Sequence, residues 1–364
     1  GVTWFTLGDF ETKAWAAYGD VSYELSDQWS VSVGGRYTED ERDALVRRET
    51  YLGLGSPYFG NTAAILITVP DPDGVPVFNG TRTDTDFTPR VSVSFRPTAD
   101  HNLYASWSQG FKGGSFDPRG AYTTPEVGEG FEPETVDTYE LGWKASFAGG
   151  RARTALAVFY SDYKDVQVPA SVAIDTNGDG VDDSFAGATT NAAAATIQGI
   201  ELEGVFQFTD AFSATLAFGY IDAEYDEWLQ AIGTPPVLTD VSDLFDFQNT
   251  PDTSGNLSLR YEWPLTLFGN DGALALMGAI THRGDTQQFE AANALLDQPS
   301  YELYDAGLVW TSSDHRYQAG LHGKNLSDEE YKIAGYSFPT LGGGTITAFY
   351  GNPRQVFGSF SVKF

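Results

Sequence analysis

Hydrophobic and polar residues alternate one by one over most of this chain, which is the pattern of β-strands with two different faces. At the C-terminus, Val356, Gly358, Phe360, Val362 and Phe364 alternate with Gln355, Phe357, Ser359, Ser361 and Lys363. Charged residues inside such runs fall on the polar face, as Glu140 and Lys144 do between Tyr139 and Phe147. The pattern predicts strands that separate an apolar from a polar environment.

Thirteen strands of this kind are predicted, with no helix of ordinary length between them. They lie at about 15–25, 29–38, 90–96, 103–111, 137–147, 152–166, 196–208, 212–225, 254–263, 273–283, 301–311, 317–326 and 355–364. Short turns alternate strictly with long loops, which lie near 43–84, 112–134, 167–195, 226–253, 284–300 and 327–354. Short turns at one rim and long loops at the other are typical of outer-membrane barrels. A soluble sandwich or propeller is the alternative, but it would mix its loop lengths. The sequence therefore predicts an all-β, transmembrane, antiparallel up-and-down β-barrel.

Composition narrows the function classes. At 41% hydrophobic and 14% aromatic, the chain of 364 residues is too apolar to be disordered. A formal charge of -29, from 50 acidic and 21 basic residues, argues against nucleic acid as a partner, because phosphate binding depends on Lys and Arg. The lack of cysteine excludes disulfides, thiolate catalysis and Cys-based metal sites. Cations and cationic surfaces are the better-matched partners.

Six stretches resemble, in the same order, blocks of the C-terminal part of the barrel of TonB-dependent receptors, the energised outer-membrane transporters of Gram-negative bacteria. They are "GGRYTEDER" (34–42), "TPRVSVSFRPTADHNLYASWSQGFKGGSFDPRG" (88–120), "FEPETVDTYELGWKASF" (131–147), "GIELEGVFQ" (199–207), "LHGKNLSDEEY" (321–331) and "FGSFSVKF" (357–364). The resemblance implies import of a scarce ligand, above all a ferric siderophore, with energy supplied by the TonB complex of the inner membrane. It implies a multi-pass protein of the outer membrane, in contact with lipid and lipopolysaccharide.

The resemblance also implies parts that this sequence does not contain. They are a signal peptide, an N-terminal plug, a TonB box and the early strands of the barrel. Large plugged transporters have about 22 strands, so residues 1–364 are expected to be the C-terminal part of such a barrel, either a piece of a longer chain or a subunit completed by another chain. In the family, the terminal strand is read by the barrel-assembly machinery, a role that would fall to Phe360, Val362 and Phe364. The same residues are also expected to contact lipid.

One loop has the spacing of a calcium site. In "DTNGDGVDD", Asp175, Asn177, Asp179, Val181 and Asp183 occupy positions 1, 3, 5, 7 and 9 of a calcium-binding loop. Position 12 is Ala186 instead of the bidentate glutamate, so modest affinity is expected. An Asp/Asn/Gly run is also ordinary turn chemistry, and both interpretations stay open. No other cofactor is expected.

Ligand contacts are expected near the loops, by analogy with the family. The candidates are Gln109, Phe111, Lys112, Tyr122, Trp228 and Phe289. Charged residues on the polar face, such as Glu140, Lys144 and Arg260, are interpreted as cross-strand ion pairs rather than a ligand pathway. The four histidines lack metal-ligand spacing, and no nucleophile elbow or phosphate loop is present, so no enzymatic role is predicted. A passive porin and a structural or surface-interaction protein are the alternatives to a transporter.

Overall fold

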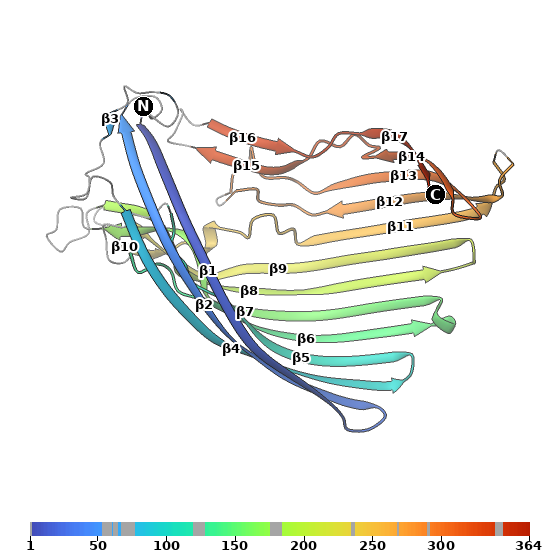
Figure 1. The fold of residues 1–364 in the computed structure, drawn as a ribbon, viewed down its shortest axis with the longest axis horizontal. Coiled ribbons are helices and arrows are strands. Elements are labelled where there is room, and N and C mark those ends of the chain that lie inside the picture. Colours follow the sequence, from blue (N-terminus) through green and yellow to red (C-terminus); the bar gives the residue numbers. More distant parts are fainter. Residues whose placement is uncertain are drawn as a thin grey trace.

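The computed structural model describes residues 2–52, 60, 65–66, 77–118, 128–174, 184–233, 237–267, 269–289, 292–338 and 345–364. Thirteen strands follow one another in a single antiparallel sheet, in the order β1-β2-β4-β5-β6-β7-β8-β9-β11-β12-β13-β14-β17 (Figure 1). Their bounds are β1 Val2–Glu24, β2 Trp29–Leu52, β4 Val77–Thr98, β5 His101–Lys112, β6 Glu134–Phe147, β7 Ala152–Ile174, β8 Ser184–Gln207, β9 Phe212–Ile232, β11 Thr253–Pro264, β12 Gly272–Arg283, β13 Tyr301–Ser312, β14 Tyr317–Lys324 and β17 Gln355–Val362. The predicted number and order of strands are confirmed.

Short elements lie in the long connections. β3 (Ile65–Leu66) pairs with β2, and β10 (Val237–Asp240) pairs with β9. β15 (Lys332–Phe338) and β16 (Thr345–Tyr350) form a separate hairpin. Two 3-10 turns are also present among the described residues: η2 (Ala148–Gly150) follows β6, and η3 (Ser242–Leu244) follows β10. No helix in the described part of the chain is long and apolar enough to cross a membrane.

Several strands are longer at the long-loop end than the sequence predicts. β1 has 23 residues and β2 has 24, whereas about 9 to 11 residues suffice to cross a bilayer. The loops predicted at 43–84, 167–195 and 226–253 are therefore partly strand, which corrects those boundaries. The apolar alternation ends near the predicted strand ends, but backbone pairing continues beyond them because it needs no apolar side chains.

Two strands near the C-terminus are shorter than predicted. β17 ends at Val362, although the backbone N–H of Lys363 still donates to the carbonyl of Arg316 at 2.9 Å. β14 ends at Lys324, because Asn325 has a left-handed backbone (φ 47°) that cannot continue a strand. The predicted assembly residues Phe360 and Phe364 are 72% and 111% exposed, and Val362 is half-buried.

The two faces of the sheet differ as the alternation predicts. Large apolar side chains on one face are exposed: Val21 is 71% exposed, Leu141 64% and Trp15 52%. We call this the apolar face, and the face that carries Glu140, Lys144 and Arg260 the polar face. A continuous exposed apolar band is what lipid covers in a membrane barrel.

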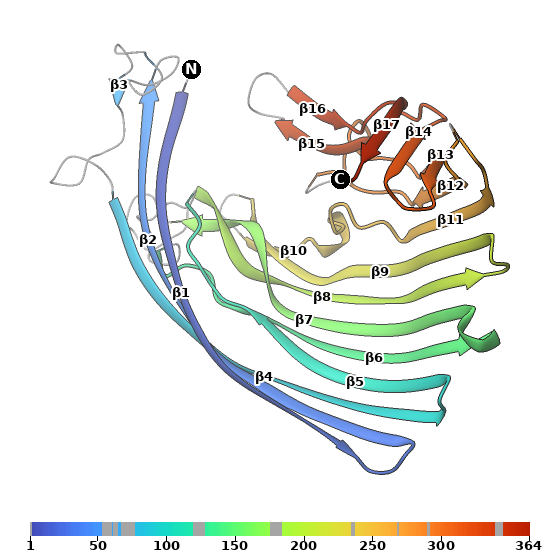
Figure 2. The same ribbon diagram turned by 45° about the vertical axis from the view of Figure 1, so that its right-hand side comes forward.

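The sheet is not closed among the described residues. The strand order begins with β1, which pairs only with β2 in this sheet, and ends with β17, which pairs only with β14. Figure 2 shows the sheet curving from β1 round to β17, with an opening between them. The architecture is that of a partial antiparallel barrel.

Candidate functional site at the long-loop end

An aromatic cluster around the buried Trp228 fixes the connection between β9 and β11. Tyr225 stacks on Phe247 with ring centroids 4.3 Å apart, and Trp228 stacks on Phe245 at 4.2 Å. An extra residue in β9, between the pairs Ala195↔Tyr225 and Ala194↔Glu227, keeps Tyr225 and Trp228 on the polar face. Together with Val168, Ala193 and Val241, these rings hold residues 241–247 against the polar face.

Asp240 ties the same connection to β9. Its carboxylate accepts hydrogen bonds from the backbone N–H groups of Trp228 and Ser242, both at 3.0 Å. These backbone hydrogen bonds hold the pKa of Asp240 below its ordinary value, because they stabilise the ionised form. The connection is therefore anchored by packing and by a charged acceptor.

A second clamp holds the connection between β5 and β6. Arg82 on β4 bonds Asp84 at 2.7 Å and Glu132 at 2.9 Å, and Asp84 accepts the backbone N–H of Gly114 at 2.8 Å. A Cβ at Gly114 would overlap the carbonyl of Phe131 and the guanidinium of Arg82, so this position requires glycine. Both ends of the connection thus lie against β4.

Two amide side chains, one on β7 and one on β8, also hold the β5–β6 connection in place. Gln167 Nε2 on β7 donates to the carbonyls of Gly113 (3.1 Å) and Glu132 (3.0 Å). Asn191 on β8 donates to the carbonyl of Glu132 at 2.7 Å and accepts its N–H at 2.6 Å. These bonds satisfy backbone groups that no strand pairing reaches.

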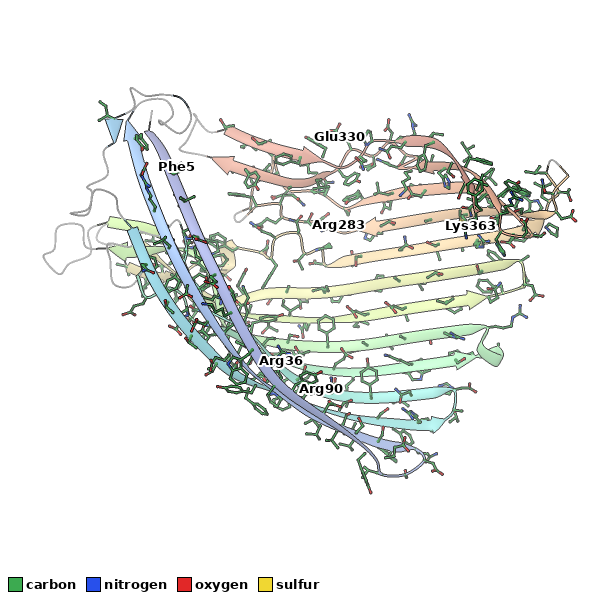
Figure 3. The ribbon with its side chains drawn as sticks, in the orientation of Figure 1. Phe5, Arg36, Arg90, Arg283, Glu330 and Lys363 are labelled. Carbon is green, nitrogen blue, oxygen red and sulfur yellow. The ribbon has the colours of Figure 1, made fainter. Side chains whose placement is uncertain are left out.

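Between the β9–β11 and β12–β13 connections lies a cavity of about 540 Å³. Its polar lining includes Asp246, Asp252, Asp285, Thr286, Asp297 and Gln298, and Ala223, Phe247 and Pro299 contribute apolar surface. Asn249 N–H donates to the carbonyl of Gln287 at 3.0 Å, and Arg283 donates to the carbonyl of Asn249 at 2.8 Å, which joins the two connections. Arg283 lies at the long-loop end of β12 (Figure 3). Pockets of this size suit small molecules, and we take the cavity as the candidate binding site.

Those predicted ligand-contact residues that the structure describes lie on different elements and faces. Gln109 and Phe111 alternate in register with Trp107 and therefore lie on the apolar face. Lys112 lies on the polar face, where its ammonium pairs with Glu134 at 3.3 Å.

The other predicted residues lie elsewhere. Trp228 is 4% exposed inside the aromatic cluster, and Phe289 is half-buried in the β12–β13 connection, next to the cavity-lining Gln287. Tyr122 and the proposed calcium ligands Asp175, Asn177, Asp179, Val181 and Asp183 lie outside the described residues.

Some charged residues of the polar face pair across strands, as predicted: Arg90 bonds Asp20 at 3.5 Å, and Tyr104 donates to Glu140 at 2.5 Å. Arg260 instead pairs with Glu262, two residues along the same strand β11, which corrects the cross-strand interpretation for this residue. Within the described ranges, no three His, Asp or Glu side chains are arranged to hold a metal ion.

Sequence reasoning missed the polar residues that hold the connections. Asp84, Gln167 and Asn191 carry no local signal, because their partners are distant in sequence. Asn325, within the stretch 321–331, is another such residue; it is 4% exposed, and its amide bonds Glu329 and Asn352. An Asn at a predicted strand end, followed by Leu326, Ser327 and Asp328, is the turn signal that would have found it.

Comparison with known proteins finds one matching family and several similar receptors. The family described as "TonB dependent receptor-like, beta-barrel" matches residues 5–326. The pesticin receptor of Yersinia enterocolitica is 24% identical over 334 residues, covering 88% of this chain and 40% of that protein. The metal-pseudopaline receptor CntO of Pseudomonas aeruginosa is 25% identical over 345 residues, covering 94% and 39%. The chain thus spans about two fifths of the length of these curated relatives.

Solved structures share the fold. The ferric yersiniabactin uptake receptor FyuA from Yersinia pestis matches with a TM-score of 0.71 and 22% identity, covering 99% of this chain and 47% of that one. The siderophore receptor PiuA from Acinetobacter baumannii matches with a TM-score of 0.67 and 16% identity, covering 98% and 44%. These matches confirm the predicted barrel architecture.

Proposed function

The chain belongs to the TonB-dependent receptor β-barrel family, and we propose that it forms part of a transporter that imports a metal chelate, specifically a ferric siderophore. Barrels of this family are receptors of the Gram-negative outer membrane, not enzymes. The relatives support the ligand class, because their names refer to pseudopaline–metal complexes and ferric siderophores. The observation that carries the proposal is the family match over residues 5–326.

The partners follow from the same proposal. The TonB complex supplies energy through a region preceding these strands, and the barrel-assembly machinery reads the terminal strand with Phe360, Val362 and Phe364. Lipid and lipopolysaccharide cover the apolar face. The ligand enters at the long-loop end, where the two clamped connections and the cavity lie. A further proposal is that Asp175, Asn177, Asp179, Val181 and Asp183 bind calcium in the loop between β7 and β8.

Uptake of radioactive iron tests the transport proposal. Cells that lack the protein and cells that express it are given ⁵⁵Fe as ferric yersiniabactin or ferric pyoverdine, each with and without functional TonB. Uptake that requires both the protein and TonB is expected for at least one chelate. Uptake of small solutes without TonB would favour a passive porin. A structural role would be favoured if cells that express the protein took up none of the chelates and cells that lack it showed impaired assembly of the cell surface.

A further inference from the structure

A groove of about 510 Å³ crosses β5, β6 and β7 on the apolar face. The wall nearer the long loops is a row of aromatic side chains that are paired in the strand register: Trp107, Tyr139 and Tyr160. The opposite wall is the next row of the same face: Ala105, Leu141 and Val158. Tyr139 is 52% exposed and Leu141 64%, so the groove opens outward, away from the polar face.

A polar row follows the aromatic row toward the long loops. Gln109 lies opposite Asp137, and Asp137 lies opposite Asp162. Trp107 Nε1 donates to Asp137 at 3.1 Å, and Lys164 bonds Asp162 at 3.4 Å. Such a change from apolar to charged side chains occurs where the hydrocarbon of a membrane meets the head groups. The groove therefore lies at the boundary of the outer leaflet, because the long loops of outer-membrane barrels are extracellular.

Two hydrogen-bond donors at the groove have no protein partner. Among the described residues, none accepts from the hydroxyl of Tyr139 or of Tyr160. Tyrosine at a membrane interface bonds polar groups with its hydroxyl while its ring contacts apolar ones. A molecule that fills the groove and satisfies these donors has an apolar chain with a carbonyl at its polar end. A lipid acyl chain has this form.

The charged row selects the head group of the lipid. The carboxylates of Asp137 and Asp162 accept hydrogen bonds but donate none, and the ammonium of Lys164 bonds them at 3.9 Å and 3.4 Å. A sugar supplies hydroxyl donors to the carboxylates, and a phosphate on that sugar pairs with the ammonium. Lipopolysaccharide combines acyl chains with a phosphorylated sugar, and the proposed function places it against the apolar face.

We propose that this groove binds one acyl chain of lipopolysaccharide at a fixed position. The carbonyl of the chain accepts from Tyr139 and Tyr160, and the phosphorylated sugar lies over Asp137, Asp162 and Lys164. The site differs from a general lipid coat, because methylenes held between two rows of side chains gain dispersion contacts that a flat surface does not give. The inference rests on the outer-membrane location in the proposed function and is independent of the imported ligand.

Photocrosslinking in intact cells tests the site. Benzoylphenylalanine, a photoreactive amino acid, replaces Leu141 in one variant and Leu257 in another. Leu257 is the matched reference, because it is also exposed on the apolar face, on β11, and does not line the groove. After illumination, an antibody to lipopolysaccharide is expected to detect at least about threefold more adduct at position 141 than at position 257, because binding holds an acyl chain at the groove.

Filling the groove is expected to remove this difference. Ala105→Leu should lower the adduct at position 141 at least about threefold, because the larger side chain occupies the space of the acyl chain. Ala17→Leu should not change it, because Ala17 is exposed on the apolar face of β1, outside the groove. Tyr139→Phe combined with Tyr160→Phe retains the rings and removes both donors, so the adduct should also fall. Heat-dependent gel migration verifies that each variant is folded.

The proposal would be overturned by equal adduct at positions 141 and 257, or by adduct at position 141 that Ala105→Leu or the paired tyrosine variant leaves unchanged. A phospholipid on the crosslinked peptide in place of lipopolysaccharide, identified by mass spectrometry, would also overturn it. The cells lack functional TonB and receive no chelate, so these results leave the transport proposal intact. Groove-specific adduct on a protein that imports no ferric chelate would refute the transport proposal alone.

Discussion

Replacing Asn325 with alanine is expected to loosen the attachment of the last strand. Asn325 Nδ2 donates to the carbonyls of Glu329 (2.8 Å) and Asn352 (3.1 Å), and Oδ1 accepts the N–H of Glu329 at 2.8 Å. The side chain is buried, and the bond to Asn352 reaches the segment that leads into β17.

The magnitude follows from what the substitution removes. Three hydrogen bonds of 3.1 Å or shorter are lost in a buried site, at about 1 kcal/mol each, and a longer one from the Ser327 hydroxyl at 3.4 Å is lost with them. The left-handed backbone of Asn325 adds about 1 kcal/mol, because alanine has no side chain to stabilise that conformation. The expected loss is about 4 kcal/mol of local or global stability.

Urea unfolding in lipid vesicles and hydrogen exchange of residues 351–362 measure the effect. Asn325→Gly separates the two terms, because glycine retains the backbone conformation and loses only the hydrogen bonds. Asn352→Ala is the control: Asn352 contributes only its carbonyl to Asn325, so a change within about 0.5 kcal/mol is expected. A loss below about 1 kcal/mol for Asn325→Ala, with unchanged exchange in β17, would refute the reasoning.

Three further outcomes are expected. Gly114→Ala should release the β5–β6 connection and cost about 1–3 kcal/mol, measured by limited proteolysis and thermal unfolding, because its Cβ would overlap the Phe131 carbonyl; Gly19→Ala, with open space around it, should change little. Asp240 has a lowered pKa, so its contribution to stability is complete above its unfolded value of 3.8 and is lost as the pH falls through the lower folded value. Asp240→Asn should flatten that acid dependence when Trp fluorescence is followed against pH, and an unaltered profile would contradict it. Asp175→Ala and Asp179→Ala should weaken calcium binding in a titration of the purified protein; an isotherm identical to that of the parent protein would rule out a calcium site there.

Much of the fold follows directly from local sequence. The alternation of Tyr139, Leu141 and Trp143 with Glu140 and Lys144 determines both the strand and the face each residue takes, because a β-strand has a period of two. The same rule, applied along the chain, predicted thirteen strands, their antiparallel order and the side of the short turns, as observed. Adjacent strands joined by short turns have few alternatives for pairing.

The long-loop end was decided by tertiary structure. Trp228, which the sequence predicts as a ligand contact, packs against Phe245, because residues 241–247 fold back onto β9. Gln167 and Asn191 bond the β5–β6 connection over 35 and 59 positions of sequence, respectively.

Sequence by itself thus determined the membrane-spanning sheet, because side chains alternate between the two faces of a strand and their apolar or polar character shows which face each one takes. Only the folded chain decided how the connections are held and which residues of the β9–β11 and β12–β13 connections line one cavity. These features depend on contacts between segments that have no periodic pattern and are distant in sequence, so no local rule specifies them.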